Sequence, residues 1–195
     1  MKILNRILPG AAVLLASALG LVLISCAPEQ CGRPSQFPDG LRVLASPDDA
    51  LVARVRDIGR KGTDAYESRI EIYSKRDSAK PVAKMSHESA DGAHGRGVMR
   101  FSWTANSKYF VYSTISSSDS RPWQFETYVY CRQTGKFYRL DDYFGPITEQ
   151  NFLLTSSDVI TTRHLEKTGR LGEGASVTVS LRTVVPLCVP VGSSD

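Results

Sequence analysis

The sequence lacks most of the patterns that mark an enzyme. Its 195 residues include three histidines and four cysteines, so few side chains are available as general bases or thiol nucleophiles. It has no Gly-x-Ser-x-Gly turn, and no Cys-x-x-Cys pair that would indicate a redox motif or a zinc site. We therefore expect no enzymatic activity, no cofactor and no bound metal.

A strong charge of one sign is also missing. The chain has 24 basic and 20 acidic side chains, and removing residues 1–25 takes away Lys2 and Arg6 but no acidic residue. A nucleic-acid interface needs clustered Lys and Arg and a much more basic domain. The near-balanced charge therefore argues against a nucleic-acid partner.

The N-terminus has the profile of a cleaved signal peptide. Lys2 and Arg6 precede an apolar run at residues 7–24, which ends in a Pro-rich polar segment rather than a charged stop. A membrane-spanning helix needs about 20 apolar residues, so cleavage explains this pattern better than a permanent span. The remaining chain of about 170 residues is long enough for one domain with its own core.

The end of the apolar run carries a family resemblance. The sequence Leu-Ile-Ser-Cys at residues 23–26 resembles the lipobox of bacterial lipoproteins. This resemblance implies that residues 1–25 are a lipoprotein signal peptide and that Cys26 carries a diacylglycerol, with its new amino group acylated too. Two or three acyl chains make a durable membrane anchor. Because Ala27 replaces the aspartate of inner-membrane lipoproteins, the resemblance implies an outer-membrane, periplasm-facing location.

Residues 26–40 are rich in Pro, Gly and polar side chains, which predicts a disordered, partly extended tether. An oxidising envelope compartment favours one disulfide among the three cysteines that follow Cys26. Pairing Cys31 with Cys188 closes the longest loop and is the preferred prediction, which leaves Cys131 as a free thiol. Pairing Cys131 with Cys188 is the alternative.

The body of the chain, residues 41–195, contains an internal repeat. The segment 46–55 aligns with 104–113 at an offset of 58, and both begin with a polar turn followed by strand-forming residues. The same offset relates 70–73 to 128–131. A fainter third copy begins at residue 155, so the repeats lie near 46–90, 104–145 and 155–185. Each copy predicts a turn, a strand, a long loop and a second strand.

These repeats predict an all-β domain, an antiparallel sheet or sandwich of about three β-hairpin repeats. The segment 109–112 is apolar on both faces of a strand and is expected to be central. The phrases FSWTANSKYFVYS and YVYCRQTGKFYRL resemble a blade of the TolB-type propellers. The matching positions are Trp103, Asn106, Lys108, Tyr128, Tyr130, Thr134, Gly135 and Leu140.

A closed propeller needs at least four blades, and the chain has three repeats. The resemblance therefore implies one of two architectures. One is a curved sheet or sandwich of blade-like hairpins, and the other is an incomplete propeller that a partner completes.

Three long loops fall at equivalent positions of the repeats, at residues 56–69, 113–127 and 163–176, which predicts that they share one rim. Long loops on a rigid sheet are where binding residues usually lie, and Trp beside Arg is typical of binding hot spots. The candidate partner-binding residues on these loops are Arg60, Lys61, Arg121, Trp123, Phe125, His164, Lys167 and Arg170.

The glycine-rich stretch 86–97 carries His87, Glu88, Asp91 and His94, which are side chains that can ligate a metal. Nothing in this pattern organises them before a metal arrives, so a solvated connector is the preferred interpretation.

The combined features predict a lipid-anchored envelope protein that binds a protein partner without catalysis. It would serve either as an accessory subunit of an envelope assembly or as an immunity-type inhibitor of a periplasmic toxin. One alternative is an envelope hydrolase that uses Glu88, Asp91 or the pair Asp141 and Asp142 with a histidine. The other is a binder of an anionic envelope polymer.

Overall fold

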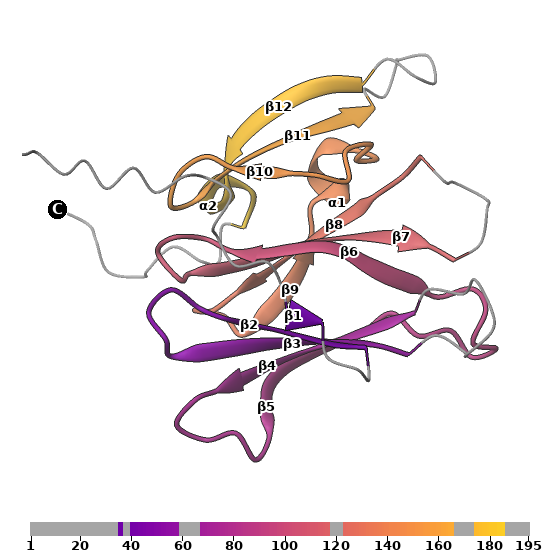
Figure 1. Ribbon diagram of the computed structural model, residues 1–195. Coiled ribbons are helices and arrows are strands. Elements are labelled where there is room, and N and C mark those ends of the chain that lie inside the picture. The colour runs from indigo at the N-terminus through magenta and orange to yellow at the C-terminus, as the bar shows by residue number, and fades with distance from the viewer. Residues whose placement is uncertain (1–34, 37–39, 59–66, 118–122, 166–173, 186–195) are drawn as a thin grey trace, which may run out of the picture. The chain divides into compact units, whose positions relative to one another are not determined.

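The computed structural model describes residues 35–36, 40–58, 67–117, 123–165 and 174–185 (Figure 1). These residues belong to one compact unit, Gly32–Asp195. They form twelve strands and two helices of four residues each, so the predicted all-β class is confirmed. Neither of these short helices has the length and hydropathy that crossing a bilayer requires.

The strands form three antiparallel sheets, in which neighbours in the chain pair with each other. Sheet A contains β1 (Ser35–Gln36), β2 (Leu41–Ala45), β3 (Leu51–Asp57), β4 (Ser68–Ser74) and β5 (Pro81–Ser86). Sheet B contains β6 (Arg96–Trp103), β7 (Tyr109–Ser116), β8 (Glu126–Cys131) and β9 (Lys136–Arg139). Sheet C contains β10 (Leu153–Leu154), β11 (Val159–Leu165) and β12 (Gly174–Ser180), and the helices are α1 (Asp141–Phe144) and α2 (Leu181–Val184).

The turns that precede β3 and β7 are built from the same side-chain hydrogen bonds. In both turns a hydroxyl donates to the side chain two residues later and accepts the N–H of the first strand residue. The residues are Ser46, Asp48 and Leu51 in the first turn and Thr104, Asn106 and Tyr109 in the second. Asp49 and Ser107 both have a positive φ, of 59° and 60°. The same side-chain chemistry therefore starts the same hairpin twice.

Each repeat extends beyond the predicted hairpin. The predicted pairs are present as β3 with β4, β7 with β8 and β11 with β12. A further strand precedes each pair, and a fourth strand follows it in sheets A and B. In the described part of sheet C there is no fourth strand, because β12 runs directly into α2.

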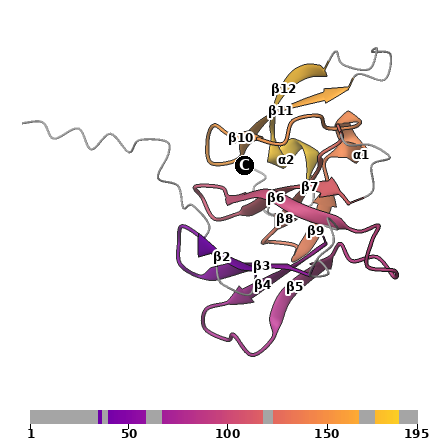
Figure 2. The ribbon, with the colours of Figure 1, turned by 45° about the vertical axis from the view of Figure 1, so that its right-hand side comes forward.

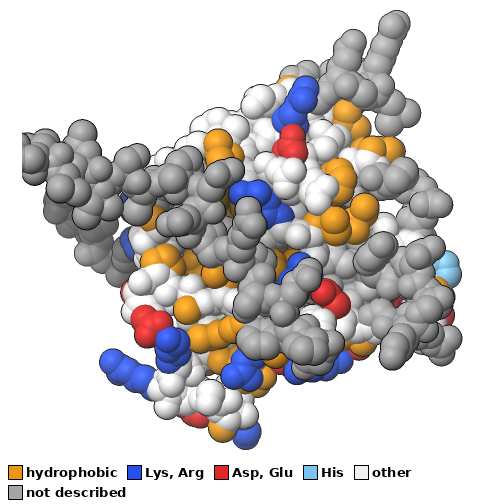
Figure 3. Space-filling view, viewed as in Figure 1, with side chains coloured by type: hydrophobic (Ala, Val, Ile, Leu, Met, Phe, Trp, Pro, Cys, Tyr) orange, Lys and Arg blue, Asp and Glu red, His pale blue; other side chains and the backbone are white. Residues whose placement is uncertain are grey.

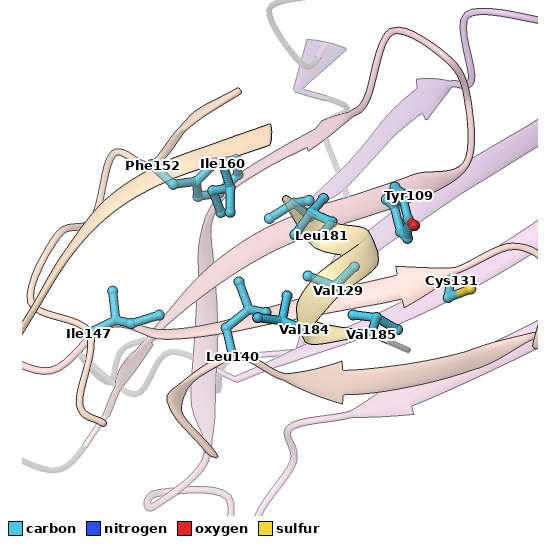
Figure 4. Packing of buried hydrophobic residues seen from close by; sticks show 11 residues of the cluster. Tyr109, Val129, Cys131, Leu140, Ile147, Phe152, Ile160, Leu181, Val184 and Val185 are labelled. Atoms are coloured by element: carbon cyan, nitrogen blue, oxygen red, sulfur yellow. The ribbon is translucent and has the colours of Figure 1, made fainter. Parts of the chain in front are cut away.

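Sheet B packs between sheets A and C. Along β7, Tyr109 and Val111 contribute to a buried cluster with sheet C, whereas Phe110 and Tyr112 contribute to a second cluster with sheet A. All four side chains are at most 1% exposed, so the prediction that this segment is central is confirmed. Figure 4 shows the first cluster, in which side chains from α2 lie close to those of β7 and β8.

The outward faces of sheets A and C carry polar side chains beside exposed apolar ones such as Val82 and Leu153. On sheet A this face carries Arg54, whose guanidinium lies 4.2 Å from the centroid of the Tyr73 ring, and several Lys and Arg side chains are visible over this sheet in Figure 3. On sheet C, Thr161 and Thr178 hydrogen-bond to each other at 2.8 Å. The described sheets are open at their edges, so both predicted architectures remain compatible with the outer faces.

The predicted tether contains two residues of the sheet. Ser35 and Gln36 form β1 and pair with Val43 and Arg42 of β2, because even a short Pro-flanked stretch can satisfy its backbone groups at a sheet edge. The signal peptide 1–25 and the rest of the tether, apart from Gly40, lie outside the described residues.

Cys131 is disulfide-bonded, and its partner lies outside the described residues, as Cys26, Cys31 and Cys188 all do. Cys131 is therefore not the free thiol that the preferred pairing implied. Its side chain is buried in the cluster that joins sheets B and C. The alternative prediction, Cys131 with Cys188, involves a residue outside the described part of the chain.

Candidate functional site

The candidate site lies at the end of the sheets where β3, β7 and β11 end and β4, β8 and β12 begin. We call this end the rim. Five predicted site residues lie outside the described residues, namely Arg60, Lys61, Arg121, Lys167 and Arg170. Trp123, Phe125 and His164 are described, and each is partly buried.

The segment 146–148 brings Phe125 and His164 close together. The N–H of Phe125 donates to the carbonyl of Ile147 at 2.8 Å. On the other side, 146–148 exchanges two backbone hydrogen bonds of 2.8 Å with 163–165, and Ile147 forms a β-bridge with His164. Two predicted site residues from different repeats thus flank the same backbone.

A buried carboxylate fixes the base of the Trp123 loop. Asp141 accepts hydrogen bonds from the N–H of Thr127 at 2.9 Å, the N–H of Ile147 at 3.1 Å and the amide of Gln124 at 3.2 Å. Burial raises the pKa of Asp141 above its usual value, although these hydrogen bonds oppose the shift. Because Gln124 and Thr127 are both held, Trp123 emerges from an ordered backbone.

Aromatic rings gather beside this base. The ring of Phe144 in α1 lies 6.3 Å from that of His164, and the neighbouring Tyr143 is 49% exposed. The buried Nδ1 of His164 has no hydrogen-bond partner in the described part of the chain, which is uncommon in folded proteins. Partly exposed aromatic side chains offer a large contact area at little conformational cost. The described rim is therefore suited to contact with another macromolecule.

The first and second repeats are also joined at the rim. The buried Glu67 carboxylate accepts the N–H of Gly95 at 3.0 Å, and the N–H of Ser117 donates to the carbonyl of Gly95 at 3.0 Å. A Cβ atom at Gly95 would lie 2.4 Å from the carbonyl oxygen of His87, so this position accepts only glycine without rearrangement. The start of β4 and the end of β7 are held together through this one residue.

The four residues considered as metal ligands have different partners. His87 is buried and hydrogen-bonds Tyr112 at 3.1 Å, whereas Arg69 donates to Glu88 at 2.8 Å, and Asp91 pairs with the exposed His94. The expectation of a solvated connector is therefore wrong for His87, because its ring fills the interface between sheets A and B. No group of three or more His, Cys, Asp or Glu residues in the described segments is placed to hold a metal.

His87 belongs to a buried polar network that the sequence did not reveal. The Tyr112 and Tyr128 rings stack with their centroids 5.2 Å apart, and the Tyr128 hydroxyl donates to Glu126 at 2.6 Å. Arg96 lies 3.3 Å from the same carboxylate. Burial lowers the pKa of His87 to about 4 and raises that of Tyr112 well above its usual value. Because these groups satisfy one another, the network joins the sheets rather than presenting a reactive group.

The remaining features do not assemble with the predicted residues. Arg139 donates to Asp142 at 2.8 Å, while Asp141 has its own donors, so the two carboxylates are engaged separately. A cavity of about 330 Å³ lies at the opposite end of sheet B from the rim. Its lining includes Lys108, Tyr109, Cys131, Arg132 and Gln133.

No protein-family model matches this sequence, and no curated protein matches it. One similar solved structure is the crystal structure of a protein assigned as a dipeptidyl aminopeptidase IV from Bacteroides ovatus, at 15% identity and a TM-score of 0.42. The match covers 76% of this chain and 26% of that one, so this chain spans about a quarter of that protein's length. A likeness this distant carries no argument about activity.

Proposed function

We propose that this chain is a lipid-anchored, non-enzymatic protein of the cell envelope that holds a protein partner at its rim. The main support for the proposal is that the backbone next to Trp123 is held in place, because Gln124 and Thr127 donate hydrogen bonds to the buried Asp141 carboxylate. Binding costs less conformational entropy when the contact residues emerge from an ordered backbone. Trp is also enriched among the residues that dominate binding energy.

The anchor in this proposal is Cys26, which carries the lipid and holds the domain on the periplasmic side of the outer membrane. Its support is the Leu-Ile-Ser-Cys motif that follows the apolar run. We also propose that the stack is propeller-like, because β2–β5 of the five-stranded sheet A and β6–β9 of sheet B are each a four-stranded antiparallel meander, and such a meander is the unit of a propeller blade.

A protein partner fits the described rim better than an anionic polymer does. Trp123, Phe125 and His164 place rings at the described rim, and contact through rings is worth more when apolar area is buried against another protein. Attraction between exposed charges, by contrast, is screened within about 8 Å at physiological ionic strength. Capture that persists at high salt therefore supports the protein partner, and capture that disappears supports the polymer.

The rim is tested with Trp123→Ala in a binding assay against the captured envelope partner. Removing a central Trp from an interface weakens affinity by roughly thirtyfold or more, since hot spots are worth about 2 kcal/mol. The matched control is Val82→Ala, which truncates an exposed apolar side chain, 53% exposed, at the opposite end of sheet A. Equal binding by both variants would contradict the rim proposal, and a lower melting temperature for Trp123→Ala would place this side chain in the core.

The anchor is tested separately by membrane fractionation of Cys26→Ser. The substituted chain is expected in the soluble fraction, because the thioether to the lipid cannot form. Retention in the membrane together with an unchanged acylated mass would rule out the lipobox interpretation.

A further inference from the structure

Sheet C ends in a strand that has a neighbour on one side only. The pairing order is β10, β11, β12, and no described residue pairs with the far side of β12. Figures 1 and 2 show β12 at the margin of the sheet with β11 beside it. In sheets A and B, β5 and β9 fill the corresponding position. Within the described residues β12 is followed by α2, whose Leu181 and Val184 are buried in the core.

The composition of β12 leaves this edge open to pairing. Natural sheet edges are usually blunted by charged side chains, proline or bulges. The edge strands β5, β6 and β9 have such features, namely Pro81, Lys84, Arg96, Arg100, Lys136, Arg139 and a register shift near residues 98–100. By contrast, the seven residues of β12 include no charge and no proline.

The strand also alternates strictly. Ala175, Val177 and Val179 lie opposite His164, Thr162 and Ile160 of β11, on the face that packs against sheet B. Ser176, Thr178 and Ser180 lie on the outward face. Val177 and Val179 are only partly buried, whereas the more central Ile160 is fully buried. An added strand would complete their burial if it carried apolar residues at alternate positions.

We infer that β12 pairs with β12 of a second copy of this chain. In an antiparallel pair centred on Val177, Ala175 lies opposite Val179 of the other copy, and Ser176 lies opposite Thr178. Apolar side chains then meet apolar ones on the core face, and hydroxyl groups meet on the outer face. Two three-stranded sheets become one continuous sheet about a twofold axis. This self-complementary alternation selects a second copy over other extended segments.

Cross-linking tests the register of this pair. Directly opposite residues have their Cβ atoms about 4.5–5.5 Å apart, close to the separation that a disulfide bridges. The full-length chain with Val177→Cys is therefore expected to form a disulfide-linked dimer in cells, seen at twice the mass on a non-reducing gel. The matched control Thr161→Cys lies on the neighbouring strand β11 and is expected to stay monomeric. Dimers in neither variant, or in both equally, would overturn the pairing.

The stability of the dimer is tested with Thr178→Lys, which places a charge on the outward face of the edge. Two lysines near the twofold axis repel, so sedimentation of the full-length chain in detergent is expected to show roughly a tenfold weaker dimer. Thr161→Lys, on the outward face of β11, should leave the dimer unchanged. A wild-type chain that sediments as a monomer, or a Val177→Cys adduct with a different protein, would overturn the inference. Trp123 does not belong to β12, so Trp123→Ala should still dimerise.

Discussion

The carboxylate of Asp141 offers the sharpest test of how the rim is built. It accepts two backbone N–H groups and one side-chain amide, and its side chain is buried. In Asp141→Ala the donors on Thr127 and Ile147 lose their acceptor inside the protein. Each buried donor left without a partner costs about 1–3 kcal/mol, so we expect the free energy of unfolding to fall by about 2–6 kcal/mol.

The assay is equilibrium unfolding in urea followed by circular dichroism. Domains of this size have a total stability of about 5–15 kcal/mol, and urea slopes are about 1–3 kcal/mol per molar. The Asp141→Ala midpoint should therefore fall by about 1 M or more. Acrylamide quenching of the tryptophan emission should increase as well. Trp103 is buried and inaccessible to the quencher, whereas the backbone next to Trp123 becomes less ordered in the variant.

The conservative variant Asp141→Asn separates the role of the acceptor from that of the charge. Burial raises the pKa of this carboxyl in the folded protein, so its ionisation weakens the folded state. This part of the free energy of unfolding is fully present below about pH 3.8 and declines as the pH rises through the raised value, while the N–H groups of Thr127 and Ile147 keep their acceptors. Asp141→Asn keeps one acceptor and should lack this decline. If Asp141→Ala unfolds within about 0.5 kcal/mol of the wild type, as substitutions at an ordinary surface position do, the carboxylate does not hold the rim together.

Three further outcomes follow from the described contacts. Because burial lowers the pKa of His87 to about 4, the wild type should lose about 3 kcal/mol of stability as the pH falls from 6.5 to 4. In urea titrations, His87→Phe should flatten this part of the dependence of stability on pH. An unchanged slope would contradict the burial of His87. Gly95→Ala places a Cβ 2.5 Å from the Glu67 carboxylate. Overpacking of this kind should lower the free energy of unfolding by about 1–3 kcal/mol and reduce the melting temperature. An unaltered melting temperature would mean that the first and second repeats are not joined at Gly95. Cys131→Ser should lower stability by about 2–4 kcal/mol, and a reductant should destabilise the wild type but not the variant, whereas equal sensitivity would argue against the disulfide.

Local chemistry explains why part of the fold could be predicted from the sequence. The turns before β3 and β7 have a hydroxyl residue followed two positions later by Asp or Asn, and these side chains make the same hydrogen bonds in both. The segment 109–112 is apolar on both faces. A strand buries two apolar faces only when it lies between two packed layers. The strand β1 was missed because it consists of Ser35 and Gln36 beside prolines, a composition typical of a linker.

The candidate site was predictable only in its surface residues. Trp123, Phe125 and His164 stand out from the sequence as ring side chains in predicted long loops, although His164 lies in β11. The groups that position them do not stand out. Asp141 resembles an ordinary turn aspartate, and its partners are 6, 14 and 17 residues away along the chain. The partner of His87, Tyr112, is 25 residues away in the next repeat, and no local sequence pattern indicates a contact at that separation.

Photo-cross-linking in living cells tests the central claim most directly. A photoreactive amino acid in place of Trp123 of the full-length chain, with the same residue in place of the exposed Val82 as control, reports which proteins lie at each end of the sheets. The account predicts one discrete adduct from position 123 and none from position 82, with the partner identified by mass spectrometry. No adduct at position 123, or the same adducts at both positions, would contradict a binding rim.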